Sequence, residues 1–195
     1  MKLSIIVTDS GPLITLGVAQ ALDALLAPGL PVIVPDMVRF EVIRDLDKPG
    51  AREVADWIRA NEPARVRVAS TEVFEEFEIL RRVNSATKTN NRGEQAAAEV
   101  LTKELEQQDR GAILVFEDSM VRKNNFLIRL PDEVVVTSTA EFLLALEEHG
   151  YLVSASEVLA RAVQVRGNEV LQRHLTGTSE VLDSWPEQMQ ATPRG

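Results

Sequence analysis

Five short apolar segments alternate with segments of helical periodicity, and this alternation constrains the fold of the 195-residue chain more than any other feature. The segments typical of strands are Leu3–Thr8, Pro31–Val34, Arg65–Ala69, Ala112–Phe116 and Glu133–Val136. The main helical segments are Asp36–Leu46, Ala51–Ala60, Glu72–Val83, Arg92–Leu105, Ser119–Ile128 and Ser138–Glu148. Such alternation predicts a parallel sheet with helices on both faces, so we expect a three-layer, Rossmann-like α/β domain.

We expect this domain to span residues 1–152, followed over 153–195 by a C-terminal helical extension with a loosely ordered tail. The helix of the extension is expected over Ser154–His174, with an interruption at Gly167. Ser154 and Glu157 form a capping-box pattern that opens the helix of the extension, as Ser138 and Glu141 do for the last helix of the domain. The extension carries an apolar stripe that the core, a second copy or an inhibitor must cover: Val158, Leu159, Ala162 and Val163.

Composition excludes several classes of site. The chain has no cysteine, which excludes disulfides, thiolate nucleophiles and cysteine-bound zinc, and its two histidines disfavour a histidine-rich metal site. No apolar run approaches the roughly 20 residues of a membrane span. We therefore expect a cytoplasmic protein without membrane partners.

Four acids lie where a predicted strand passes into a helix, or on the helix just after it: Asp9, Glu41, Glu94 and Asp118. The carboxyl ends of parallel strands face a common crevice. Carboxylates gathered there would repel one another unless a cation neutralised them. Oxygen ligands suit Mg²⁺ or Mn²⁺, so the leading hypothesis is a divalent metal site that serves phosphodiester chemistry.

Ordinary structural roles are also open to these acids. Asp9 and Asp118 can cap the helices that follow them, and Glu94 completes a capping-box pattern with Asn91. Glu41 lies too deep in its helix to cap it, but it can pair with a neighbouring arginine on an exposed face.

Three further residues at strand ends are candidates for the same site. Glu117 competes with Asp118 for the inward position, because neighbouring residues of a strand face opposite ways. Ser10 and Thr137 follow the first and last strands and offer hydroxyls to a ligand or a water, although both can also belong to helix caps.

The charge distribution is uneven. The net charge of −9 argues against a protein that coats nucleic acid non-specifically. Two acid-free islands, 79–93 and 119–131, nevertheless lie beside the candidate acids. Their cations are either solvated surface residues or contacts for the phosphates of a bound polyanion, and the candidates for RNA binding are Lys88, Arg92, Arg122 and Lys123.

Taken together, several segments resemble PIN-domain ribonucleases, in particular the toxins of VapBC-like toxin–antitoxin pairs. The matching segments are DSGPLITL, VIVPDMVRFEVI, NRGEQAAAEVL, LVFED and VVVTSTAEFLLAL, within residues 1–152. The resemblance implies that Asp9, Glu41, Glu94 and Asp118 bind the metal, with Ser10 and Thr137 as supports.

The same resemblance implies Mg²⁺- or Mn²⁺-dependent endonucleolytic cleavage of RNA. It also implies assembly as a homodimer and inhibition by a small antitoxin whose tail enters the site. The chain departs from the family's pattern after the last strand, where a common Gly–Thr–x–Gly segment is replaced by Thr137–Ala140.

Two other functions remain open. One is a PIN-like module that has lost effective catalysis and binds RNA or a protein partner. The other is a phosphoacceptor signalling domain, which needs an Asp at the end of the middle strand and a Lys after the last one. The third strand ends at Ala69–Ser70 and the segment 137–148 contains no Lys, so the sequence disfavours the signalling domain.

Overall fold

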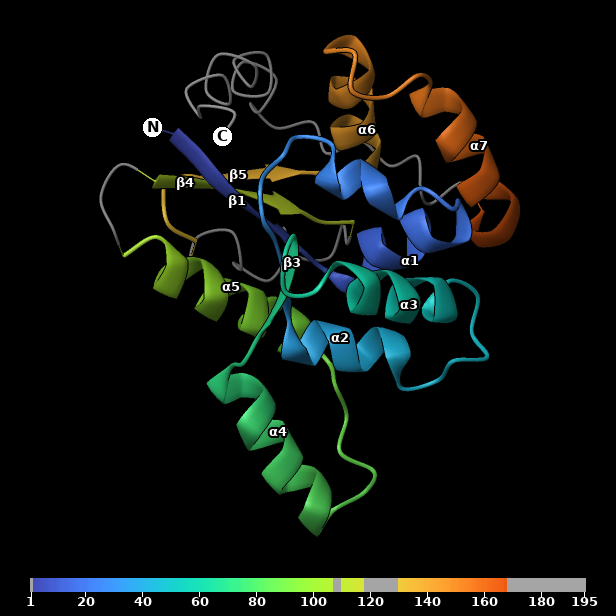
Figure 1. The fold of residues 1–195 in the computed structure, drawn as a ribbon. Helices are drawn as coiled ribbons and strands as arrows, with labels where there is room; N and C mark the ends of the chain where they lie inside the picture. The colour runs from blue at the N-terminus through green and yellow to red at the C-terminus, as the bar shows by residue number, and fades with distance from the viewer. Residues whose placement is uncertain (1, 107–109, 118–129, 168–195) are drawn as a thin grey trace.

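A computed structural model describes residues 2–106, 110–117 and 130–167 of the chain (Figure 1). Five strands form one sheet in the order β3-β2-β1-β4-β5, and every neighbouring pair is parallel. The strands are β1 (Lys2–Thr8), β2 (Val32–Pro35), β3 (Val66–Ala69), β4 (Arg110–Val115) and β5 (Val134–Thr137). The predicted parallel sheet is confirmed, with β1 at its centre and β3 at one edge.

Strand residues alternate between two apolar cores, one on each face of the sheet. In β4, Ile113 and Val115 belong to one core, whereas Ala112 and Leu114 belong to the other. This alternation follows from the two-residue period of a strand, and a sheet that is covered on both faces needs the near-continuous apolar strands found in this chain.

Helices cover both faces. The first layer contains α1 (Ser10–Val18), the 3-10 helix η1 (Leu22–Leu26), α3 (Ala51–Asn61), α6 (Thr139–Glu148) and α7 (Ala155–Arg166). On the other face lies α5 (Arg92–Glu104), and α4 (Glu72–Val83) projects from it away from the sheet (Figure 1). Helix α2 (Asp36–Ile43) directly follows β2 and contacts helices of both layers. The three-layer α/β/α prediction is therefore confirmed.

Helix α2 is shorter than the sequence predicts. It ends at Ile43 rather than at Leu46, because the chain beyond it is a polar, exposed turn. Helix α7 ends at Arg166, because Gly167 takes a φ of +77°, so the predicted interruption at Gly167 is confirmed. The rest of the predicted helix, up to His174, lies outside the described residues. The predicted helix Ser119–Ile128 lies outside the described residues.

The C-terminal helix α7 packs on the core of the domain. Ala155, Val158, Leu159 and Ala162 are buried in the same apolar core as α1 and α6. Ser154 caps the helix as predicted, with its hydroxyl accepting a hydrogen bond from the backbone N–H of Glu157 at 3.2 Å. Within the described ranges, no helix is both long enough and apolar enough to cross a bilayer.

Candidate metal centre

Asp9 lies between the central strand β1 and helix α1, and only 7% of it is exposed. It occupies the N-cap position of α1 but makes no capping hydrogen bond with its side chain. The pKa of Asp9 is raised to about 7, mainly by burial. The backbone N–H groups of Ser10 and Gly11 oppose the rise, and the negative charges of Glu94 and Glu117 contribute to it. Asp9 is therefore a buried carboxyl group at the start of α1, with other acids near it.

Glu41 lies in the second turn of α2 and is half-buried. The pKa of Glu41 is raised to about 7, mainly by burial and also by the negative charges of Asp9 and Glu94. A hydrogen bond with the Thr89 side chain opposes the rise, and so, most weakly, does the charge of Arg44. The exposed arginine pair considered from the sequence therefore does not account for the position of Glu41.

The first turn of α5 lies against both carboxyl groups. Gly93 is buried in this turn, and a Cβ atom on it would lie 2.9 Å from Glu41 Oε2 and 3.3 Å from Asp9 Oδ1. The absence of a side chain lets both carboxylates approach the same Cα atom. Glu94 follows directly. Asn91 takes a φ of 58° and makes no capping bond with its side chain, so the proposed capping box is not formed by Asn91.

Glu117 follows β4, the neighbour of β1, and its side chain is 14% exposed. Its Oε2 accepts hydrogen bonds from Thr15 Oγ1 at 2.9 Å and from Arg166 Nη1 at 2.6 Å. Its Oε1 is buried and has no hydrogen-bond partner among the described residues. The charge of Glu117 acts on Asp9, so this acid belongs to the same group. The competing Asp118 lies outside the described residues.

The two predicted supports differ in their positions. Ser10 is the first residue of α1, and its backbone N–H acts directly on the Asp9 carboxylate. Thr137 ends β5, which is separated from β1 by β4, and its hydroxyl donates to the carbonyl of Ser138 at 3.3 Å. The predicted capping box of Ser138 and Glu141 is confirmed.

The basic side chains predicted to bind RNA differ in their exposure. Lys88 is exposed on the loop between α4 and α5. Arg92 has a side chain only 17% exposed; its guanidinium lies 5.6 Å from the ring centre of Phe77 and 3.6 Å from the carboxylate of Glu76. Arg92 therefore makes contacts within the protein. The other two predicted cations, Arg122 and Lys123, lie outside the described residues.

Within the described ranges, no three acidic or histidine side chains are already gathered in an arrangement that holds a metal ion. The donors nevertheless fit a hard divalent cation, because all of them are carboxylate oxygens. Asp9 and Glu41 meet at Gly93. The negative charges of Asp9 and Glu94 contribute to the raised pKa of Glu41, and those of Glu94 and Glu117 contribute to the raised pKa of Asp9. Glu117 contacts Thr15 of α1, and its buried Oε1 has no hydrogen-bond partner among the described residues.

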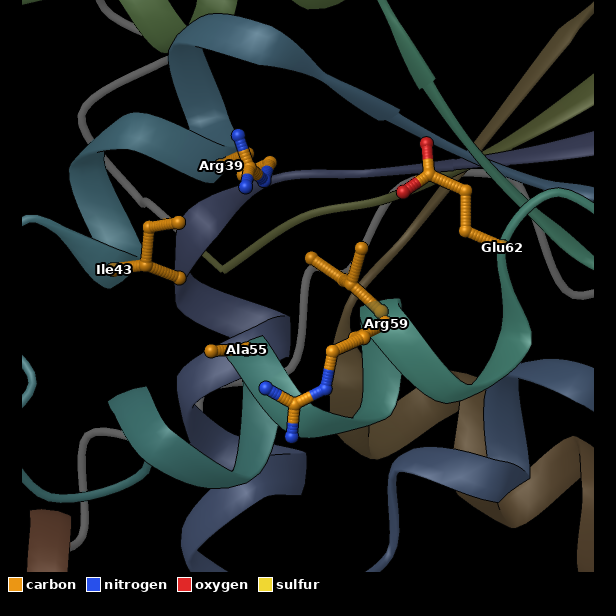
Figure 2. A pocket seen from close by; sticks show the side chains of 6 residues that line it. Arg39, Ile43, Ala55, Arg59 and Glu62 are labelled. Carbon is orange, nitrogen blue, oxygen red and sulfur yellow. The ribbon is translucent and has the colours of Figure 1, made fainter.

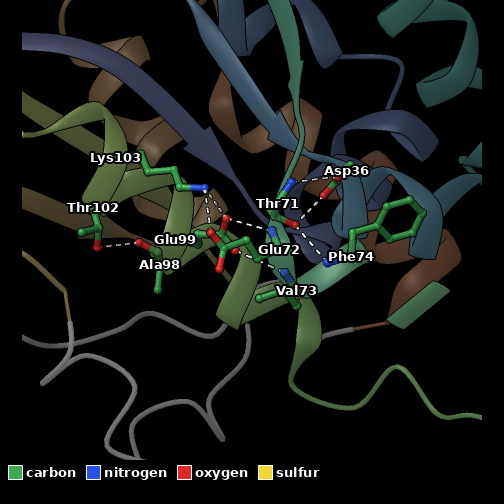
Figure 3. A network of polar contacts seen from close by, with 9 residues as sticks. All are labelled: Asp36, Thr71, Glu72, Val73, Phe74, Ala98, Glu99, Thr102 and Lys103. Carbon is green, nitrogen blue, oxygen red and sulfur yellow. Dashed lines mark hydrogen bonds and ion pairs between the residues drawn. The ribbon is translucent and has the colours of Figure 1, made fainter. Parts of the chain in front are cut away.

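Other acids near the end of the sheet have structural roles (Figure 3). Asp36, which follows β2, accepts hydrogen bonds from the N–H and the hydroxyl of Thr71 at 2.9 and 2.7 Å. Glu99 of α5 accepts bonds from two N–H groups in the first turn of α4, at 2.9 and 3.3 Å, and from Lys103 at 2.7 Å. These acids fasten the N-terminus of α4 to α2 and α5.

A pocket of about 320 Å³ lies between α2 and α3 (Figure 2). Residues two positions apart on a helix point in nearly opposite directions. Arg39 and Ile43 line the pocket, so Glu41 lies on the other side of α2. The pocket is separate from the group of acids, and its remaining lining residues are Ala55, Ile58, Arg59 and Glu62.

Sequence reasoning missed three contributors to the site: Thr89, Thr15 and Arg166. Thr89 belongs to the polar segment NSATKTNN, and its position three residues before Arg92 was its one visible signal. Thr15 and Arg166 gave no signal, because their contacts with Glu117 depend on how α1 and α7 pack.

Comparison with models of protein families found no match for this chain, and a search of curated proteins found no significant match. The fold and the arrangement of Asp9, Glu41, Glu94 and Glu117 are therefore the features that bear on its function.

Proposed function

We propose that this chain is a divalent-metal-dependent endoribonuclease that cleaves RNA phosphodiester bonds. The observation that supports the proposal best is the pairing of Asp9 with Glu41. The two carboxyl groups come from different elements, meet at Gly93 and have pKa values raised to about 7. Buried carboxylates that repel one another destabilise a fold, and a cation bound between them reverses this effect.

The proposed roles follow from the positions of the side chains. Asp9 and Glu41 would hold Mg²⁺ or Mn²⁺, with Glu94 and Glu117 beside them as further ligands or as acceptors for a water. Asp118 is kept as a ligand on the sequence resemblance alone. A bound cation of this kind lowers the pKa of a water and neutralises charge on the phosphate.

Neighbouring residues would orient the acids and the substrate. Thr89 donates a hydrogen bond to Glu41 and restricts its carboxylate. Lys88 directly precedes Thr89, so its exposed side chain belongs to the loop that contacts the site. We propose that Lys88 contacts RNA phosphates there, with Arg92, Arg122 and Lys123 as weaker candidates.

The biological setting proposed for the enzyme rests on the resemblance to PIN-domain toxins. In that setting the chain is the toxin of a cytoplasmic toxin–antitoxin pair, acts as a homodimer and is inhibited by a small antitoxin. Inspection of the neighbouring reading frame for a small protein tests the pairing at little cost.

One observation favours a second function, a PIN-like module that binds RNA or a partner without effective catalysis. Oε2 of Glu117 is bound by Arg166 and Thr15, so this oxygen is not directed at a cation. Calorimetric titration with Mg²⁺ or Mn²⁺ separates the two functions, because the module has no requirement for a metal.

The activity is tested with purified wild type and Asp9→Asn, incubated with total RNA in Mn²⁺, in Mg²⁺ or in EDTA. We expect cleavage by the wild type with metal, none in EDTA and none by Asp9→Asn. Asp56→Asn is the matched control, because Asp56 is an exposed acid that pairs with Arg59 away from the site. Cleavage by Asp9→Asn at the wild-type rate would show that the assigned site is wrong.

A further inference from the structure

Arg166, in the last turn of α7, reaches the end of the sheet where the acids lie. Its Nη1 donates to the carbonyl of Gly11 at 2.9 Å, to the hydroxyl of Thr15 and to Oε2 of Glu117 at 2.6 Å. The first two partners belong to α1, which begins directly after Asp9. Helix α7 therefore places a positively charged guanidinium beside the group of acids.

The contacts of Glu117 are divided unequally between its two oxygens. Oε2 accepts both described hydrogen bonds, from Arg166 and from the fully buried Thr15. Oε1 is buried and accepts none from the described residues. Hydrogen bonds between a guanidinium and a carboxylate are short and strong, so Arg166 restricts the rotation of Glu117 and leaves Oε1 without a partner among the described residues.

We propose that Arg166 is a positioning residue, which holds Oε2 of Glu117 so that the other oxygen, Oε1, serves the cation site at Asp9. The carboxylates that bind metals in proteins are themselves held by hydrogen bonds from surrounding residues, and loss of such a partner weakens metal binding. The inference rests on the proposed function, since it requires a cation at Asp9. It gives α7 a role in the site beyond covering the core.

The same helix offers a matched control. Arg161 also lies on α7, and its Nε donates to the carbonyl of Ala19 at 2.8 Å, at the end of α1. This arginine fastens α7 to α1 as Arg166 does, but its described contact is with a backbone carbonyl and not with an acid. Arg161→Gln therefore perturbs the attachment of α7 and leaves the bonds to Glu117 in place.

The test is calorimetric titration of the full chain with Mn²⁺ alone, for the wild type, Arg166→Gln, Glu117→Gln, the double variant and Arg161→Gln. We expect Arg166→Gln to weaken Mn²⁺ binding roughly tenfold. Arg161→Gln should bind as the wild type does. Arg166→Gln should have no further effect once Glu117 is replaced, because Arg166 acts through Glu117. Urea unfolding of each variant shows whether it is folded.

Thr15→Val is the second variant, in case Arg166→Gln does not fold. It removes the other donor to Oε2 and should weaken Mn²⁺ binding several-fold in the same Glu117-dependent way. Unchanged binding by both variants would make the contact purely structural and overturn the inference. Tighter binding by Arg166→Gln would also overturn it, because Arg166 would then compete with the cation. If the wild type binds no Mn²⁺, the proposed function itself is wrong. Failure of the proposed function is thereby distinguished from failure of the inference about Arg166.

Discussion

Asp9 and Glu41 meet at one glycine: Oδ1 of Asp9 and Oε2 of Glu41 lie 3.3 and 2.9 Å from the position that a Cβ atom on Gly93 would occupy. Each of the three residues comes from a different part of the fold, namely the end of β1, the second turn of α2 and the first turn of α5. The pairing therefore exists only in the folded chain, and its effects on stability and on metal binding are measurable.

Asp9→Asn should stabilise the metal-free protein at neutral and alkaline pH. The Asp9 carboxyl keeps its proton up to about pH 7 in the folded state but loses it near pH 3.8 in the unfolded chain. The folded state thus binds more protons between these values, so wild-type stability falls as pH rises through this window and stays lower above it. The full loss corresponds to roughly 4 kcal/mol.

Urea unfolding in EDTA measures this effect. The wild type and Asp9→Asn should be similar in stability near about pH 4, and the variant should be the more stable at about pH 8. A constant difference between the two proteins across this range would mean that Asp9 has an ordinary pKa in the folded state.

Gly93→Ala should disturb the metal site more than the fold. The new methyl group would lie 2.9 Å from Glu41 Oε2, a distance that requires the carboxylate to move. We expect Mn²⁺ affinity to fall by at least about tenfold, as for the loss of a residue that supports a metal ligand. Gln95→Ala is the control, because Gln95 is exposed in the same turn of α5. Equal Mn²⁺ binding by the two variants would argue against a cation at this glycine.

Lys88 and Arg92 should respond differently to replacement by Gln. Lys88→Gln should weaken RNA binding and reduce the slope of log affinity against log salt by about 0.7, because one phosphate contact is lost. Arg92→Gln should instead lower the free energy of unfolding, since its guanidinium lies over Phe77 and beside Glu76.

RNA binding is measured by fluorescence anisotropy in the Asp9→Asn background, where the RNA is expected to stay intact. An unchanged salt slope for Lys88→Gln would assign this lysine to the solvated surface.

Glu99→Gln should loosen the attachment of α4. Burial alone would raise the pKa of Glu99, but the hydrogen bonds from Lys103 and from the backbone of α4 outweigh it and hold the pKa below its usual value. The stabilisation by Glu99 is therefore present near neutral pH and is lost as pH falls through the lowered pKa. We expect the variant to lose about 1–2 kcal/mol of unfolding free energy at neutral pH.

Urea unfolding compares Glu99→Gln with Glu75→Gln, an exposed position on α4. The two should become more alike in stability under acidic conditions. Equal stability of Glu99→Gln and Glu75→Gln at neutral pH would mean that the hydrogen bonds between Glu99 and α4 make no net contribution to the free energy of unfolding.

Most of the fold was predictable because its signals are local. The continuous apolar run of β4 and the 3.6-residue pattern of α5 are visible in short windows of sequence. The positions of Asp9 and Glu41 near strand ends predicted a shared location, since the carboxyl ends of parallel strands lie on one edge of the sheet. Their meeting point at Gly93 was not predictable, because it depends on how α5 packs against α2.

The contacts of Glu117 mark the limit of sequence reasoning. The pattern of β4 left the inward position open between Glu117 and Asp118, because the choice depends on where the chain leaves the strand. Arg166 belongs to α7, and the sequence pattern of this helix predicted only an apolar stripe. Its contact with Glu117 joins residues that local periodicity cannot relate, and it depends on the rotation of α7 against α1.

The most direct measurement of the central claim is anomalous scattering from a crystal of this protein soaked in Mn²⁺. The account predicts a peak of density at roughly 2.1 Å from carboxylate oxygens of both Asp9 and Glu41, close to Gly93. Well-defined carboxylates at these positions with no anomalous peak between them, at saturating Mn²⁺, would contradict it.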